Sequence, residues 1–337
     1  MSLLLGVMLL MTLQAPVESE VAFEGAGKLK LFGTLTMPAN SAGKKLPAML
    51  LLPGSGPTDR NGNQMPSLTT NVLRQISDSL AANGIASLRF DKRATQLYRD
   101  TWPKKMDEIA EFFKWENFVD DATSGYRYLT LQSGIDSKRV GIIGHSEGAE
   151  IALQIGSNLS KTSEVPAAII TLGGAGRPMG PILVEQISRI MDKQQLPLAV
   201  KKQYLANLQE VIDQVKKDGT YPTGILPGLK ALFNPSTPKI MHSYCAIDPT
   251  NLAKAYPGPV LLINGAHDSQ VSPERDTPLL KDALKSRPSG TVEMLIVPDA
   301  SHNLKSTTAG NDDAFEGPVS SVALDKIKQF LKKVFQP

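Results

Sequence analysis

The sequence contains the pentapeptide Gly144-His145-Ser146-Glu147-Gly148, placed between a short apolar run, 140–143, and a helix-like segment, 149–153. A strand that turns directly into a helix holds the residue at its apex in a strained conformation, with the side chain clear of the backbone. Strand and helix crowd together there, so the residues two before and two after the apex must be small, as Gly144 and Gly148 are. The pattern therefore predicts that Ser146 is a nucleophile. A chance match is the alternative, because Gly-x-Ser-x-Gly is common, and the rest of the chain has to supply the partners.

Strand-like and helix-like segments alternate from residue 47 onward. Apolar runs typical of buried strands lie at 47–53, 85–90, 140–143, 167–172, 260–264 and 292–297. Helical spacing is found at 68–83, 118–131, 273–285 and 318–335, and the helix after the pentapeptide is expected to end near Leu159. Segments 20–24 and 28–37 are predicted to form a pair of antiparallel strands. Alternation of this kind predicts an α/β fold, with a mostly parallel sheet and helices on both faces.

One segment interrupts the alternation. Between Leu172 and Pro259 there is no strand-like run, and residues 181–217 have helical spacing. We therefore expect a core formed by residues 18–173 and 258–337, with a helical insertion at 174–257. A long insertion in a sheet protein is typical of a lid over the site. A helical decoration without contact to substrate is the alternative.

The N-terminus is apolar from Met1 to Leu13 and is followed by Gln14-Ala15-Pro16. This run is shorter than the roughly 20 residues that cross a membrane, and it is similar to the apolar part of a secretory signal peptide. We predict a signal peptide, or a remnant of one, at residues 1–17 and a secreted or periplasmic protein. A buried N-terminal helix and a start site assigned too late are the alternatives. No later segment of the sequence is predicted to span a membrane.

Composition excludes several classes of protein. The chain of 337 residues has 36 Lys and Arg against 33 Asp and Glu, and its basic residues are scattered, which does not favour nucleic-acid binding. Cys245 is the single cysteine and is expected to be a small buried hydrophobe; no Cys-x-x-Cys pair is present for zinc. We expect neither a metal nor an organic cofactor.

A serine hydroxyl needs a neighbouring base, which is normally histidine. The chain has four histidines. His145 lies within the pentapeptide and is expected to point away from Ser146, while His242 lies in the insertion. The nucleophile–acid–base order that accompanies this motif places the base after the last strand, and His302 occupies that position. We predict His302 as the base, with His267 as the alternative.

The acid that orients the imidazole is expected after one of two strands. The strand ending at Leu172 is followed by Gly173-Gly174-Ala175-Gly176, which has no carboxylate, whereas the strand ending at Asn264 is followed by Gly265-Ala266-His267-Asp268. Asp268 is therefore the predicted acid. A helix cap is its alternative role, for which Ser272 is better suited.

An oxyanion hole needs two backbone N–H groups. Glu147, directly after the nucleophile, is predicted to supply one, and the loop after the 47–53 strand the other. We assign the second donor to Ser55, with Gly56 as the alternative. The other alternative is that this loop is a plain turn with no role in an oxyanion hole. The cluster Asp91-Lys92-Arg93 follows the next strand, where it would either join loops by salt bridges or contact substrate.

Together these segments resemble the α/β-hydrolase superfamily, and most closely bacterial secreted or periplasmic esterases of its serine-aminopeptidase-like and dienelactone-hydrolase-like branches. The resemblance spans about residues 20 to 335, and five blocks carry it: 51–63, 89–93, 144–148, 265–271 and 301–302. It implies the α/β-hydrolase fold, a Ser146-His302-Asp268 triad and a small-molecule ester as substrate. A peptidase or thioesterase on the same triad is the alternative, and a catalytically silent binding protein of this fold is another.

Overall fold

The computed structural model describes residues 15–39, 41–308 and 315–336. The apolar run 1–13 behind the signal-peptide prediction lies outside the described residues. Every helix in the described part of the chain is too short or too polar to cross a lipid bilayer.

The described residues form one eight-stranded sheet with the order β1-β2-β4-β3-β5-β6-β7-β8. The β1–β2 and β2–β4 pairs are antiparallel, and all other neighbours are parallel. The predicted mostly parallel sheet is therefore confirmed. The strands are β1 (Val17–Glu24), β2 (Lys30–Met37), β3 (Leu46–Leu52), β4 (Ala86–Phe90), β5 (Ile135–His145), β6 (Ile169–Leu172), β7 (Val260–Gly265) and β8 (Val292–Val297).

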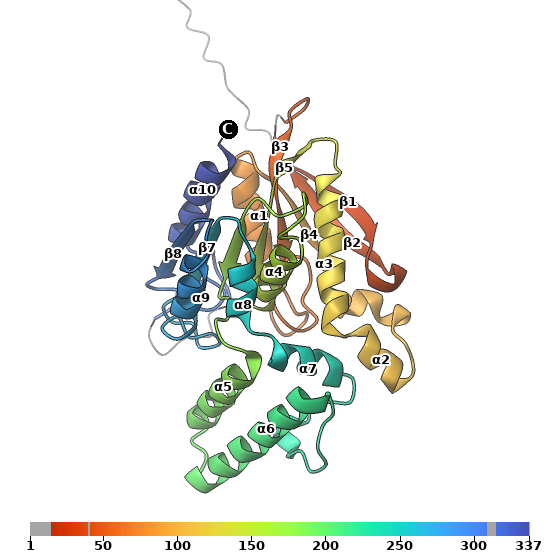
Figure 1. Ribbon diagram of the computed structural model, residues 1–337, viewed down its shortest axis with the longest axis vertical. Helices are drawn as coiled ribbons and strands as arrows, with labels where there is room; N and C mark the ends of the chain where they lie inside the picture. Colours follow the sequence, from red (N-terminus) through yellow and green to blue (C-terminus); the bar gives the residue numbers. More distant parts are fainter. Residues whose placement is uncertain (1–14, 40, 309–314, 337) are drawn as a thin grey trace, which may run out of the picture.

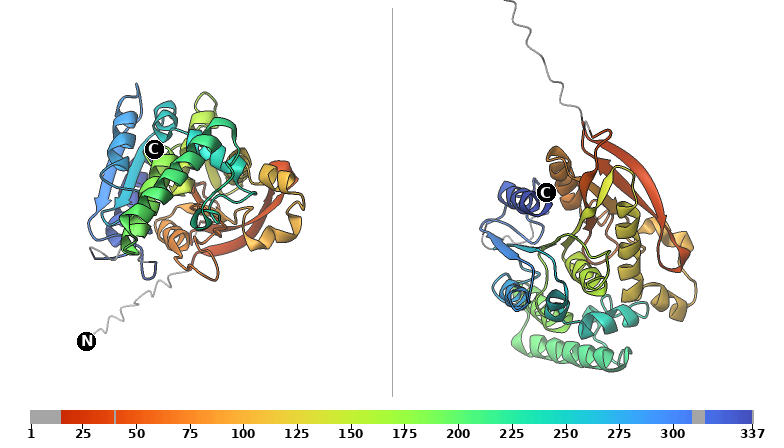
Figure 2. Two further views of the ribbon diagram at one scale, coloured as in Figure 1. Left: turned by 90° about the horizontal axis from the view of Figure 1, so that it is seen from below. Right: turned by 45° about the horizontal axis from the view of Figure 1, so that its top comes forward.

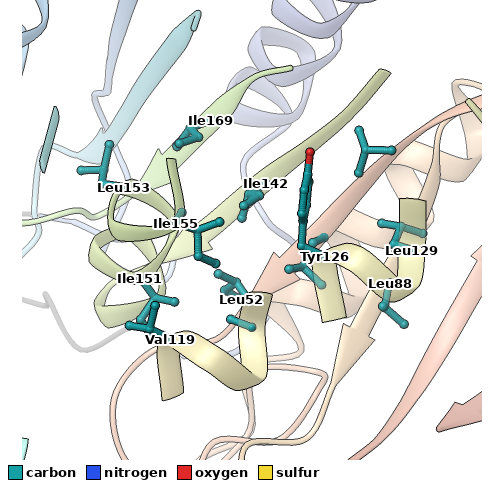
Figure 3. Packing of buried hydrophobic residues seen from close by; sticks show 14 of the residues in the cluster. Leu52, Leu88, Val119, Tyr126, Leu129, Ile142, Ile151, Leu153, Ile155 and Ile169 are labelled. Carbon is teal, nitrogen blue, oxygen red and sulfur yellow. The ribbon is translucent and has the colours of Figure 1, made fainter. Parts of the chain in front are cut away.

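Helices cover both faces of this sheet (Figure 1). One face packs against α3 (Trp115–Thr130), α4 (Glu147–Asn158), α8 (Pro249–Ala255) and α9 (Asp276–Lys285). Figure 3 shows part of this core, where Ile155 of α4 lies near Ile142 of β5 and Ile151 of α4 lies beside Val119 of α3. The other face packs against α1 (Val72–Ala82) and α10 (Ser321–Phe335). Because helices cover both faces of the sheet, the central strands are buried, and their sequences are continuous apolar runs.

Helix α1 begins later than its apolar spacing predicts. The side-chain oxygen of Asn63 accepts hydrogen bonds from the backbone N–H groups of Thr70 and Asn71, both at 2.8 Å. These bonds hold the chain in a loop up to Asn71, whose φ of 50° is left-handed. Because a side chain takes up the amides that would open the helix, the helix starts at Val72.

All regular structure between β6 and β7 is helical: α5 (Met179–Lys193), α6 (Leu198–Asp218), η3 (Pro227–Leu229), α7 (Pro238–Ala246) and α8. Helices α5, α6 and α7 lie together beyond one end of the sheet, below it in Figure 1 and in front in the left view of Figure 2. They share a small hydrophobic core that includes Leu208, Val211 and Cys245. Cys245 is 2% exposed, and burial raises its thiol pKa to about 11, so this cysteine is a packing residue.

Residues 91–114, between β4 and α3, contain η2 (Gln96–Thr101) and α2 (Met106–Phe112). A buried ion pair anchors this region. Arg93 donates to Asp121 of α3 through Nε at 2.7 Å and Nη2 at 2.6 Å, and the N–H of Ala26 donates to the same carboxylate at 2.8 Å. Burial raises the pKa of Asp121, and the Arg93 guanidinium opposes that shift.

We expect Asp121→Asn to lower the free energy of unfolding by about 3–5 kcal/mol, because it leaves the Arg93 charge buried without a counter-ion. Urea unfolding monitored by circular dichroism measures the effect. The matched control is Glu164→Gln, which breaks an exposed pair with Arg127 and should cost less than about 1 kcal/mol. A loss at Asp121 as small as the control would contradict the expectation.

Candidate active site

Ser146 lies at the sharp turn between β5 and α4. Its backbone has φ 54° and ψ −121°, an unfavourable conformation for a residue with a side chain. A Cβ atom on Gly144 would come within 2.0 Å of the Gly148 carbonyl oxygen, and one on Gly148 within 2.4 Å of the Leu52 carbonyl oxygen. Both positions therefore require glycine, and the strain at Ser146 follows from how closely β5, α4 and β3 approach each other.

The structure brings Asp268 and His302 together. Nδ1 of His302 lies 2.7 Å from Oδ2 of Asp268, and both residues are buried. The other carboxylate oxygen of Asp268 accepts the backbone N–H groups of Gln270 and Val271, each at 2.9 Å. Asp268 is thus held by its own loop after β7, and its free hydrogen-bonding edge orients the imidazole.

Gly173, directly after β6, links Ser146 to His302. The Ser146 N–H donates to the carbonyl oxygen of Leu172 at 2.8 Å, which places Ser146 beside the start of this loop. Gly173 has φ 60°, and a Cβ there would come within 2.9 Å of the His302 ring. Among the described residues no hydrogen bond joins Ser146 Oγ to His302. Such bonds are often long in unliganded enzymes and tighten with substrate.

His145 stabilises the loop that carries His302. Its Nε2 lies 3.0 Å from the backbone oxygen of His302, and the two rings are 4.9 Å apart between centroids. Burial, helped by the nearby His302 ring, lowers the pKa of His145 to about 3. The ring is therefore neutral at physiological pH, and because a carbonyl oxygen only accepts, Nε2 must carry its proton.

The two assigned oxyanion donors lie next to Ser146. Glu147 opens α4, whose first-turn amides have no partner within the helix. Ser55 lies in the loop after β3, and no other described residue accepts a hydrogen bond from its N–H. A Cβ on the preceding Gly54 would lie 3.2 Å from the Ser146 Cβ, so this loop passes directly beside the nucleophile. Ser55, Gly56, Ser146 and Glu147 all line one cavity.

The cluster after β4 forms ion pairs. Asp91 pairs with Arg60, and Arg93 with Asp121. Lys92 is buried, pairs with the Glu147 carboxylate and donates to the Gly54 carbonyl at 3.0 Å. Lys92 therefore ties the loop after β3 to the start of α4, and it also lines the cavity.

The remaining histidines lie in other surroundings. His267 N–H donates to the Ala300 carbonyl at 2.9 Å, which joins the loop that carries Asp268 to the loop that carries His302. Nδ1 of His242 lies 2.7 Å from the Val215 carbonyl, within the helical insertion. Within the described residues, no three His, Cys, Asp or Glu side chains are grouped to hold a metal ion.

The cavity beside Ser146 has a volume of about 610 Å³. Core and insertion both contribute to its wall, which is largely apolar and includes Trp102, Phe118, Ile182, Leu183 and Met241. A volume of this size is typical of small-molecule sites. The insertion thus has its own hydrophobic core and also forms part of the cavity wall.

Helix α5 is tied to the loop that carries the predicted acid. Arg189 donates to the Ser269 carbonyl at 2.8 Å and Gln186 to the Gln270 carbonyl at 2.9 Å. Arg177, before α5, forms a salt bridge of 2.6 Å with Asp276, which is fully buried. The position of α5 is therefore coupled to the segment that follows Asp268.

Glu150 is a site residue that sequence reasoning did not identify. It lies one turn of α4 after Ser146, is 3% exposed and lines the cavity. Burial, with the Glu147 and Asp276 carboxylates, raises its pKa to about 8. The available signal was its spacing: a residue four positions after the apex lies on the same helix face. An acidic residue among the apolar residues of α4 is unusual, because Glu is rarely buried without a partner.

This raised pKa gives a pH-dependent stability. Between about 4.5 and 8 the folded state binds the Glu150 proton more tightly than the unfolded state, so stability should fall as pH rises through that window. In Glu150→Gln this titration is absent. We therefore compare the free energy of unfolding of the variant with that of the parent protein. Between pH 5 and pH 8 this difference should shift by about 3 kcal/mol in favour of the variant. Urea unfolding at both pH values measures this gain, and a difference that does not change with pH would contradict it.

The fold and this strand–turn–helix site define the α/β-hydrolase class. Among solved structures, the chain is similar to Est1E from Butyrivibrio proteoclasticus, with a TM-score of 0.56, 14% identity and coverage of 94% of this chain and 98% of that one. It is also similar to a dienelactone hydrolase from Anabaena variabilis, with a TM-score of 0.53, 18% identity and coverage of 95% and 99%. These likenesses confirm the predicted fold.

Sequence comparison identifies the family. The model described as BAAT / acyl-CoA thioester hydrolase C terminal matches residues 122–307, so the chain belongs to that family. Esterase EstD of Thermotoga maritima is 26% identical over 305 residues, which are 89% of this chain and 65% of that protein. The chain therefore spans slightly less than two thirds of the length of this curated relative.

Proposed function

We propose that this protein is a carboxylic ester hydrolase that acts through a Ser146-His302-Asp268 triad. The observation that carries the proposal is the arrangement at the sheet edge: Ser146 at a strained turn, and His302 held by Asp268 across Gly173. The family match and the esterase relative support hydrolysis of esters or thioesters.

In this mechanism Ser146 Oγ attacks the ester carbonyl carbon while His302 Nε2 takes its proton. Asp268 keeps the other ring nitrogen protonated and stabilises the imidazolium. The N–H groups of Ser55 and Glu147 bind the oxyanion, each worth about 3 kcal/mol of barrier. The alcohol leaves with the proton from His302. Water then attacks the acyl-enzyme, His302 takes a proton from this water, and the acid is released as the proton returns to Ser146.

Thioester hydrolysis is the second candidate, because the family description names acyl-CoA thioester hydrolysis. A coenzyme A thioester carries phosphates, which are bound by free cations. Lys92 is the one Lys or Arg among the described residues of the cavity wall, and it is already paired with Glu147. The cavity itself thus favours an uncharged ester. A cleavage assay with butyryl-CoA beside p-nitrophenyl butyrate separates the two activities.

A fluorophosphonate probe tests the proposal directly, since it reacts with activated serine nucleophiles. The native protein should be labelled, and peptide mapping should locate the label on Ser146. Absence of label, or label that persists in Ser146→Ala, would remove the basis for a serine mechanism and leave a binding protein of this fold.

We also propose that the protein is exported, from the composition of residues 1–13. Expression in a bacterial host followed by fractionation and intact-mass measurement tests this. Recovery of the uncleaved chain in the cytoplasmic fraction would contradict the proposal.

A further inference from the structure

Two buried polar side chains on the cavity wall have no hydrogen-bond partner within the part of the chain that the structure describes. The Glu150 carboxyl takes part in no hydrogen bond or ion pair among the described residues. Tyr244 of α7 is 5% exposed, and its hydroxyl has no hydrogen-bond partner. Buried polar groups are normally paired, and an unpaired one costs about 1–3 kcal/mol, so a substrate-sized cavity with two of them invites a ligand that pairs with both.

The surroundings of these groups restrict the charge of that ligand. Burial raises the pKa of Tyr244, and the neighbouring carboxyl groups of Glu147 and Glu150 raise it further. Within the described residues, the Tyr244 hydroxyl makes no hydrogen bond that meets normal distance and angle limits. Both unpaired groups are thus uncharged near pH 7. An anionic ligand would meet the Glu147 carboxylate, and a cationic ligand would meet the Lys92 ammonium on the same wall.

A hydroxyl group matches this environment. A protonated carboxyl and a phenol each donate and accept one or more hydrogen bonds, as a hydroxyl does, so all three are satisfied without moving a charge. Glu150 lies in the first turn of α4, four residues after Ser146, and both residues line the cavity. We therefore consider a hydroxyl that lies within a few bonds of the ester carbonyl carbon.

We propose that Glu150 and Tyr244 form a polar subsite of the cavity that binds a hydroxyl group carried by the ester substrate, close to its scissile bond. This inference rests on the proposed esterase function and names its substrate class: hydroxylated short esters. The hydroxyl lies on either the acyl or the alcohol portion, and two substrate pairs distinguish these positions. Each pair exchanges the hydroxyl for a methyl group of similar size.

The acyl pair is ethyl β-hydroxybutyrate and ethyl isovalerate, and the alcohol pair is hydroxyethyl butyrate and propyl butyrate. The readout is the ratio of kcat/KM within a pair, measured by acid release. We expect the parent protein to prefer the hydroxylated ester about 10- to 100-fold in one pair, because the methyl analogue leaves both wall groups unpaired.

Three variants assign the preference to the subsite. Glu150→Leu should bring the ratio close to one, and Tyr244→Phe should lower it in part. Glu150→Gln keeps a donor and an acceptor at the same place, so the ratio should stay within about threefold of the parent value. The control Gln154→Leu lies one turn further along α4, does not line the cavity, and should leave the ratio unchanged. Thermal unfolding of each variant confirms that the ratio comes from folded protein.

Three results would overturn the inference. A ratio near one in both pairs, with the methyl analogues still cleaved, removes the subsite and leaves the proposed esterase intact. A preference for ethyl β-aminobutyrate over the hydroxy ester, abolished by Glu150→Gln, would assign the carboxyl to an ammonium group instead. Failure to cleave any ester, together with no fluorophosphonate label, would overturn both proposals.

Discussion

Replacing Ser146 by alanine is expected to lower kcat for p-nitrophenyl butyrate by about 10⁴- to 10⁶-fold. The variant has no nucleophile, while the oxyanion N–H groups and the cavity remain, so a residual acceleration over water should persist. Pre-steady-state measurement with substrate in excess should show no initial burst of p-nitrophenol in the variant, because no acyl-enzyme forms.

The geometry of the turn also predicts how Ser146→Ala affects binding. Alanine carries the same Cβ at the strained φ of 54°, so the fold and the KM should change little. Ser157→Ala, on the same helix but away from the cavity wall, is the matched control and should keep full activity. Retention of more than about one thousandth of the parent kcat by Ser146→Ala would show that another group performs the attack.

Replacing Asp268 by asparagine should lower kcat by about 10³- to 10⁴-fold without unfolding the protein. Oδ1 of Asp268 already accepts two backbone N–H groups, so the asparagine oxygen takes over those bonds and its amide N–H₂ faces His302. Nδ1 of His302 must then accept, which moves the ring proton to Nε2 and removes the base.

Asp282→Asn on the exposed side of α9 is the control for Asp268→Asn, since it makes the same chemical change far from the imidazole. The double variant Ser146→Ala with Asp268→Asn should be no slower than Ser146→Ala alone, because the triad acts as a unit. A kcat for Asp268→Asn within tenfold of the parent value would contradict the assignment of Asp268 as the acid.

Local sequence patterns were sufficient to predict a segment where burial alone determines which residues it contains. The strands 46–52 and 260–265 are buried on both faces, which leaves little room for anything except apolar residues, and their positions were predicted to within one residue. Helix starts were less predictable. Helix α1 begins at Val72 because a distant side chain, Asn63, binds the amides before it. Propensity within a short window carries no information about such a bond.

The candidate site also has some residues that local sequence patterns predict and others that depend on tertiary packing. Ser146, Asp268 and His302 each follow a strand, and the carboxyl ends of parallel strands meet at one edge of a sheet, so their order in the chain implies their approach. The roles assigned to them remain predictions until the variants are measured. Glu150 and Tyr244 had no such marker, because neither follows a strand and their place on the cavity wall depends on which segments pack around them.

The pentapeptide 144–148, its strand and helix context and the strand-end positions of Asp268 and His302 by themselves determined the fold class and the residues to test. The tertiary structure decided what surrounds them. It showed a strained turn made by the close approach of β3, β5 and α4, and a cavity shared by the core and the insertion. It also showed a carboxyl whose pKa is raised to about 8. Backbone alternation is a local property that a sequence records, whereas burial, cavity shape and pKa depend on segments far apart in the chain that meet only on folding.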